Sequence, residues 1–113
     1  TTFVKYLINS LQKKNSEKIT EITSPTFSIL NEYKVKDIKI LHYDLYRLKD
    51  EKELRNIGNV NNDKNAIILV EWPEIIKNKI SNLISLNFTY EENLTKRSLI
   101  IKTNNKKILN EFE

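Results

Sequence analysis

The sequence has 113 residues and a net charge of +4, from 19 basic and 15 acidic residues. This length suits one domain, and no apolar run approaches the roughly 20 residues of a membrane helix. The absence of Cys excludes disulfides and thiolate metal sites, and a single His excludes a site built from several histidines. Any metal would therefore be bound by oxygen ligands, which favours Mg²⁺ or Ca²⁺.

The positive charge favours an anionic partner such as a nucleotide or a nucleic acid. A compositional bias toward Lys, Asn and Ile also explains it, and the lysines are scattered rather than clustered as in a dedicated nucleic-acid module. Nothing at the N-terminus reads as a signal peptide, so we expect a cytoplasmic protein.

Apolar residues at helical spacing predict an amphipathic helix over residues 2–14, followed by a polar loop over 15–21. The helical stripe begins almost at the first residue, with no strand before it, and the sequence contains no Met. We therefore expect the chain to be a fragment of a longer protein.

A β-rich run follows over residues 22–35, in which Pro25 restricts the residue before it to an extended conformation. Phe27, Ile29 and Asn31 then alternate as side chains do along a strand. A turn at Asp37 leads into another apolar run, so the two strands are expected to form a hairpin.

The rest of the chain alternates between helical and strand patterns. Asp50 and Glu53 have capping-box spacing, and Gly58, the sole glycine, suits the end of the helix that they begin. The apolar run in "AIILVEW", 66–72, which ends in an acid, is typical of a strand buried on both faces. The predicted elements after the turn are a strand over 38–43, a helix over 50–58, an Asn-rich turn over 59–65, a strand over 66–72, a helix from Pro73 to about Lys79, strands over 83–90 and 97–103, and a helix over 104–112. This order predicts one α/β domain, residues 1–113, with a mixed sheet.

Two acids stand at the carboxyl ends of predicted strands, Asp44 after 38–43 and Glu71 within 66–72. Ligands of α/β sheets gather at these ends. Two carboxylates there could bind a hard cation, polarise a water or transfer a proton. The alternative is that each acid merely begins a loop.

Other side chains have both a functional and a structural interpretation. Ser24 and Thr26 could close over a phosphate, or could be ordinary turn hydroxyls. Trp72, the only Trp, either fills the core or offers a surface contact beside the neighbouring acid. His42, the only His, is favoured as a hydrogen-bonded structural residue over a catalytic base. The two remaining candidates are basic: Arg47, which could pair with an acid, and Arg97, which could be a solvated charge.

Four motifs occur in order: "SPTFSILNEY" at 24–33, "HYDLYRL" at 42–48, "EL" at 53–54 followed by a Gly, and "LVEWPE" at 69–74. Together they resemble the TsaE (YjeE) family, the small bacterial P-loop ATPases of tRNA threonylcarbamoyladenosine (t6A) biosynthesis. The resemblance spans about residues 1–103. It implies a P-loop NTPase-like three-layer fold with a mixed, mostly parallel central sheet. The first strand and the glycine-rich phosphate loop of that fold would precede residue 1, and "GNVNNDKN" departs from the family pattern.

The resemblance also implies roles for individual residues. Thr1 would match the phosphate-loop Thr that binds Mg²⁺, with Thr2 beside it at the nucleotide. Asp44 would lie near Mg²⁺ and the γ-phosphate, and Glu71 would bind Mg²⁺ or position water. Two further matches to nucleotide-contacting residues are Thr26, in a switch-like segment, and Arg97, near the start of a late strand.

By the same resemblance, the cofactors are Mg²⁺ and ATP, and the partners are TsaB and TsaD homologues, with tRNA engaged through their complex. ATP hydrolysis would reset the TsaB–TsaD complex between turnovers, and we expect this fragment alone to be inactive. The alternative is a non-catalytic basic α/β module that binds RNA or a partner protein.

Overall fold

The computed structural model describes residues 1–55, 65–76, 83–90 and 97–111. The chain divides into two compact units, Thr1–Asn78 and Lys79–Glu113, which are treated separately below. Among the described residues, no helix combines the length and the apolar character needed to cross a membrane.

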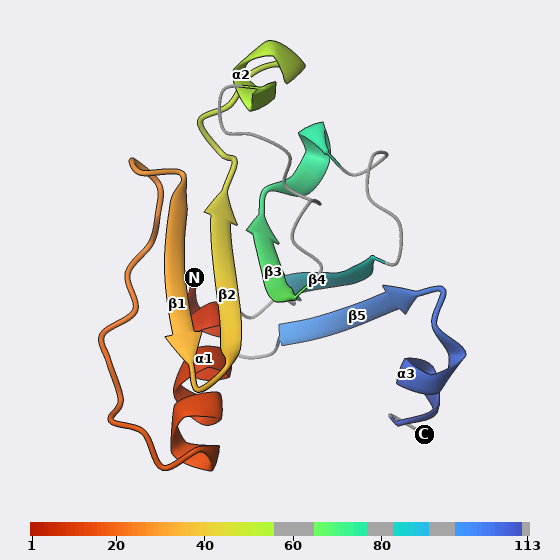
Figure 1. The fold of residues 1–113 in the computed structure, drawn as a ribbon. Coiled ribbons are helices and arrows are strands. Elements are labelled where there is room, and N and C mark those ends of the chain that lie inside the picture. The colour runs from red at the N-terminus through yellow and green to blue at the C-terminus, as the bar shows by residue number, and fades with distance from the viewer. Residues whose placement is uncertain (56–64, 77–82, 91–96, 112–113) are drawn as a thin grey trace. The chain divides into compact units, whose positions relative to one another are not determined.

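The first unit contains a three-stranded mixed sheet in the order β1-β2-β3 (Figure 1). The first two strands form the predicted antiparallel hairpin, and β3 then pairs parallel to β2. The elements of this unit are α1 (Thr2–Lys14), β1 (Leu30–Val35), β2 (Ile38–Asp44), α2 (Glu51–Arg55), β3 (Ala66–Glu71) and the 3-10 helix η1 (Pro73–Ile75). An α/β unit with a mixed sheet is therefore confirmed.

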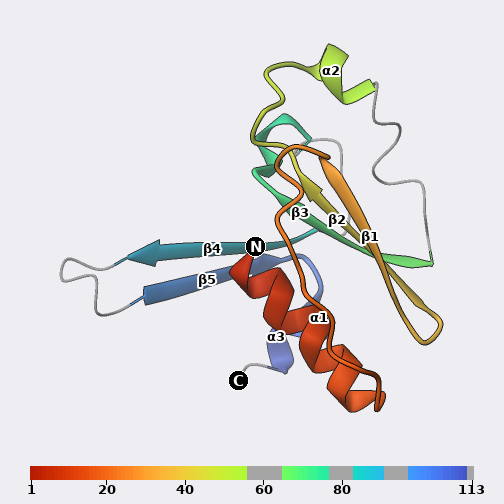
Figure 2. The same ribbon diagram turned by 90° about the vertical axis from the view of Figure 1, so that its left-hand side faces the viewer.

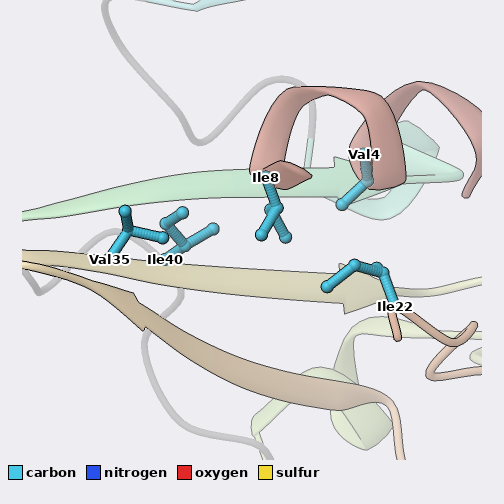
Figure 3. Packing of buried hydrophobic residues seen from close by; sticks show 5 residues of the cluster. All are labelled: Val4, Ile8, Ile22, Val35 and Ile40. Atoms are coloured by element: carbon cyan, nitrogen blue, oxygen red, sulfur yellow. The ribbon is translucent and has the colours of Figure 1, made fainter. Parts of the chain in front are cut away.

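Helix α1 matches its predicted bounds and lies along one face of the sheet (Figure 2). Figure 3 shows Val4 and Ile8 pointing from the helix toward the sheet, where Val35 and Ile40 of the hairpin lie. These side chains, together with Ile22, form the buried hydrophobic core of this unit. Because burial of apolar area stabilises the fold, this helical stripe holds α1 against the sheet.

The first strand begins later than predicted, because a turn precedes it. The Ile29 N–H donates to the Pro25 carbonyl at 2.6 Å, and Ile29 has φ 70°. Phe27, expected on the strand, is 86% exposed. The strand assignment is therefore wrong for residues 27–29, which lie in the turn after Pro25, and is confirmed for Asn31, which lies in β1.

The hairpin turn consists of Lys36 and Asp37, as the sequence predicts, and Lys36 has φ 53°. The Lys36 N–H donates to the Glu17 carboxylate at 2.7 Å. Five consecutive side chains of β2 are buried, from Ile40 to Asp44, so this is the central and best-covered strand.

One of the two hydrogen bonds of the predicted capping box at α2 is present: the Glu53 N–H donates to the Asp50 side chain at 3.0 Å. The Glu53 carboxylate accepts the Lys49 N–H at 2.7 Å, one residue earlier than a reciprocal box would have it. The predicted cap at Gly58 and the turn over 59–65 lie largely outside the described residues.

Strand β3 is less covered than its apolar sequence indicates. Its side chains are half-buried, and Ile67 is exposed. Burial on both faces is therefore wrong for β3 within the described residues. Among them, β3 also pairs with a strand, β2, along one edge only. The helix predicted after Pro73 is the single 3-10 turn η1 up to Ile75, and residues 77–79 are outside the described ranges.

The second unit contains an antiparallel pair, β4 (Ile84–Tyr90) and β5 (Arg97–Thr103), at the two predicted positions. A short helix, α3 (Lys106–Asn110), follows and is shorter than the predicted 104–112. The Asn105 side chain accepts the Lys107 N–H at 3.0 Å, which caps the start of α3.

Candidate functional site

The two predicted acids end neighbouring strands of the first unit. Asp44 and Glu71 are direct register partners in the parallel pairing of β2 with β3. The Leu45 N–H donates to the Glu71 carbonyl at 3.1 Å, which continues the pairing just past both acids. The parallel arrangement therefore brings two carboxylates to the carboxyl edge of the sheet.

Asp44 is almost fully buried and is held by hydroxyl and backbone donors. Thr26 donates its hydroxyl to Oδ2 at 3.0 Å, and the Ser24 hydroxyl lies 3.4 Å from the same atom. The Tyr46 N–H donates to Oδ1 at 3.0 Å. A buried carboxylate needs such donors, because an unpaired buried charge is strongly destabilising.

The turn after Pro25 brings these hydroxyls to the acid. The Asp44 N–H donates to the Ile29 carbonyl at 2.9 Å, so the end of the turn is bonded to the end of β2. The hydroxyls of Ser24 and Thr26 are 2.7 Å apart. From the sequence, Ser24 and Thr26 could be either functional or ordinary turn hydroxyls. In the structure both are hydrogen-bond partners of Asp44.

Glu71 is less buried and lies between the start of α1 and the middle of β2. The Thr1 hydroxyl donates to Oε2 at 2.9 Å, and the Thr1 amino group contacts Oε1. His42 Nε2 lies 3.1 Å from the same Oε2. One carboxylate thus links the first residue of the chain to the only His.

His42 is fully buried, as expected for a structural residue. Burial lowers its pKa to about 4, while the Asp44 charge acts in the opposite direction. The ring is therefore neutral at pH 7. Within the described part of the chain, its Nδ1 has no hydrogen-bond partner.

Two predicted site residues are not joined to this cluster by any described contact. Thr2 is the first residue of α1 and is exposed. Arg97 begins β5 in the second unit, where its guanidinium lies 5.0 Å from the centroid of the Tyr90 ring. Their assignment to the nucleotide stays a prediction.

Aromatic residues lie on the segments that follow the two acids, and the sequence did not predict their pairing. Trp72 is 54% exposed and its ring centroid is 4.9 Å from that of Tyr46, so the core-filling interpretation is wrong. Arg47 lies 5.2 Å from the centroid of the exposed Phe27 ring. The sequence feature that could have indicated these contacts is proximity, because each of the three aromatic residues lies within two positions of a predicted site residue.

The sequence model described as "Threonylcarbamoyl adenosine biosynthesis protein TsaE" matches residues 1–99. The chain belongs to this family. The tRNA threonylcarbamoyladenosine biosynthesis protein TsaE of Rickettsia conorii is 43% identical over 77% of this chain and 50% of its own length. The Rickettsia typhi protein of the same name is 38% identical over 93% of this chain and 70% of its own length. That of Aquifex aeolicus is 40% identical over 66% and 49%.

The chain therefore spans about half the length of the R. conorii and A. aeolicus TsaE proteins and 70% of the R. typhi protein. The resemblance inferred from the four motifs is confirmed by these matches. All the described contacts of the acids lie within the residues matched by the TsaE family.

The donor set at the sheet edge suits a hard cation. It consists of the carboxylates of Asp44 and Glu71 and the hydroxyls bonded to them, which come from Thr1, Ser24 and Thr26. Among the described residues, no group of three or more His, Cys, Asp or Glu side chains is arranged so that it could hold a metal ion by itself. Mg²⁺ is usually held by one or two carboxylates and takes its other ligands from phosphates and water. The residues present therefore fit Mg²⁺ bound together with a phosphate ligand better than a cage made by the protein alone.

Proposed function

We propose that the intact protein is a Mg²⁺-dependent ATPase that supports threonylcarbamoyladenosine formation on tRNA. The family membership supports the pathway, because the relatives are named as biosynthesis proteins of this modification. The pairing of Asp44 with Glu71 at the end of parallel strands supports the chemistry, and it is the observation on which the proposal rests.

In this proposal the two acids have different tasks. Glu71, which is partly exposed and bonded to the Thr1 hydroxyl, holds Mg²⁺ together with that hydroxyl. Bound Mg²⁺ neutralises charge on the phosphates of ATP. Asp44, buried and bonded to Thr26, holds the switch-like segment over the nucleotide and lies close enough in register to assist at the metal.

The remaining parts of the proposal come from the family resemblance. A glycine-rich phosphate loop before residue 1 would cradle the phosphates, and Thr2 and Arg97 would contact the nucleotide. TsaB and TsaD homologues would be the partners, and ATP hydrolysis would reset their complex, which itself engages tRNA. A cytoplasmic site of action suits this partnership.

The test replaces each acid by its amide in the full-length protein. We expect Glu71→Gln to lower the Mg²⁺-dependent ATPase rate, measured with the partners present, by about 100-fold or more, because the amide is a poor Mg²⁺ ligand. Asp44→Asn should also impair turnover while leaving the circular dichroism spectrum unchanged.

Glu74→Gln is the matched control, because Glu74 is an exposed acid only three residues after Glu71. Its ATPase rate should equal that of the unmodified protein. Unchanged hydrolysis in Glu71→Gln would refute the metal role, and loss of folding in Asp44→Asn would assign Asp44 to structure instead.

A further inference from the structure

His42 is a buried polar side chain that contacts an acid of the candidate site from within the sheet. It lies in the middle of β2 and is fully buried, yet its Nε2 is 3.1 Å from Oε2 of Glu71. Glu71 is the register partner of Asp44, two residues further along the strand. The contact therefore crosses from one strand to the next just behind the carboxyl edge.

The chemistry of the two groups fixes the direction of this hydrogen bond. An ionised carboxylate can only accept, so the ring must carry its proton on Nε2. Both the Nε2–H neutral ring and the imidazolium donate from this atom. The bond consequently does not depend on the protonation state of His42.

The other ring nitrogen indicates what the residue is for. With the proton on Nε2, the neutral ring leaves Nδ1 as a buried acceptor, and no described group donates to it. A buried unsatisfied acceptor destabilises the folded state, and an apolar residue of similar size would avoid that cost. The ring is thus oriented by its bond to Glu71, and this orientation leaves Nδ1 without a hydrogen bond from any described group.

We propose that His42 is a positioning residue, which fixes the rotamer of Glu71 by donating Nε2–H to Oε2. This role rests on the proposed function, because it matters only if Glu71 binds Mg²⁺ beside a nucleotide. With Oε2 held by His42 and by the Thr1 hydroxyl, the carboxylate is oriented before the metal arrives.

The experiment compares two substitutions in the full-length protein. His42→Gln places an amide N–H near the position of Nε2, whereas His42→Leu removes the donor and keeps an apolar side chain of similar size. Mn²⁺ is titrated with ATP present and followed by electron paramagnetic resonance. We expect His42→Leu to weaken Mn²⁺ binding about 10–100-fold, the usual effect of losing a group that orients a metal ligand. His42→Gln should restore it to within a few-fold.

A second measurement does not depend on metal or on activity. ¹⁵N NMR of the unmodified protein should find His42 protonated on Nε2, and ¹³C relaxation should find the Glu71 side chain more mobile in His42→Leu than in His42→Gln. Ile40→Val, a buried change two residues earlier on the same strand, is the control for general loosening and should alter neither quantity.

Each result decides between the roles. Equal loss of Mn²⁺ affinity in the Gln and Leu variants would make His42 merely structural, and no loss in His42→Leu would overturn the proposal. An Nδ1–H ring would also overturn it, even if His42→Leu does not fold. If the unmodified protein neither binds Mn²⁺ with ATP nor hydrolyses ATP, the proposed function fails. The NMR measurements then decide by themselves whether His42 orients Glu71.

Discussion

His42 and Asp44 are buried two residues apart on β2, but their polar atoms are satisfied to different degrees. Asp44 accepts hydrogen bonds from the Thr26 hydroxyl and the Tyr46 N–H. His42 contacts Glu71 through Nε2, and its Nδ1 has no partner among the described residues. Both carboxylate oxygens of Asp44 therefore have a hydrogen-bond donor, whereas the imidazole is held neutral by burial.

The lowered pKa of His42, about 4, predicts how stability depends on pH. The unfolded chain has the ordinary His pKa near 6.5, so below that pH it binds a proton that the folded chain does not. This contribution to the free energy of unfolding is complete above pH 6.5 and is lost as pH falls toward 4. From the size of the shift, we expect a loss of up to about 3 kcal/mol.

Urea unfolding at pH values between 4 and 7 checks this, with His42→Leu as the reference. The difference in unfolding free energy between the two proteins should change across this window. A constant difference would contradict the lowered pKa, because carboxylates that titrate in the same range are common to both proteins.

At the scale of elements, two of the four described non-Gly residues with positive φ lie beside the candidate site. Ile29 has φ 70° at the end of the turn that carries Ser24 and Thr26, and Trp72 has φ 57° directly after Glu71. Positive φ is unfavourable for a non-Gly residue, and most of all for a β-branched one such as Ile. Both lie where the chain must change direction to bring hydroxyls or an acid to the sheet edge, which fits the tendency of strain to collect at functional sites.

Lys36 also has a positive φ, 53°, but it lies in the hairpin turn, at the opposite end of β2 from Asp44. We expect Lys36→Gly to raise the free energy of unfolding by about 0.5–1 kcal/mol, because Gly adopts positive φ without steric cost. The bond from the residue 36 N–H to Glu17 is retained, since it comes from the backbone. Thermal unfolding measures the change.

Asp37→Gly is the matched control, one residue later in the same turn. Asp37 is not among the described non-Gly residues with positive φ, so Gly offers no relief there and adds flexibility to the unfolded chain. It should be neutral or destabilising. Equal stabilisation by both changes would show that the turn backbone is not strained at Lys36.

At the scale of the molecule, the first unit depends on a small core between α1 and the sheet. Ile8 and Ile40 are fully buried there, and Val35 lies beside them (Figure 3). Thr1, the N-cap of the same helix, donates its hydroxyl to Glu71. Packing of the core and placement of the candidate site are thus coupled through one helix.

Ile8→Ala tests the contribution of this core to stability. We expect it to lower the free energy of unfolding by about 2–5 kcal/mol, the usual range for removing a fully buried Ile side chain. Chemical denaturation provides the measurement. Ile19→Ala removes the same atoms from an exposed position and should change stability by less than about 0.5 kcal/mol. Similar losses in both variants would contradict the assignment of the core.

Much of the secondary structure could be predicted because it depends on neighbours in sequence. The apolar stripe over 2–14 predicts α1 at its observed bounds, and the runs from Ile38 and Ala66 predict β2 and β3. The prediction of the first strand was wrong at Phe27 and Ile29, because an alternating pattern is a weaker signal than the turn that Pro25 initiates. The predicted burial of β3 was wrong because burial depends on which other elements cover the strand, and the strand's own residues do not specify this.

The sequence by itself determined the family, through motifs whose order and spacing are local, and the two acids, because each ends an apolar run. Only the tertiary structure decided what those acids contact. His42 and Glu71 are 29 positions apart, and their bond depends on the parallel register of β2 with β3. Thr26 reaches Asp44 through the turn at Ile29, and Trp72 is exposed because the chain turns sharply after Glu71. Residue patterns specify elements, whereas strand register and chain reversals specify which side chains meet.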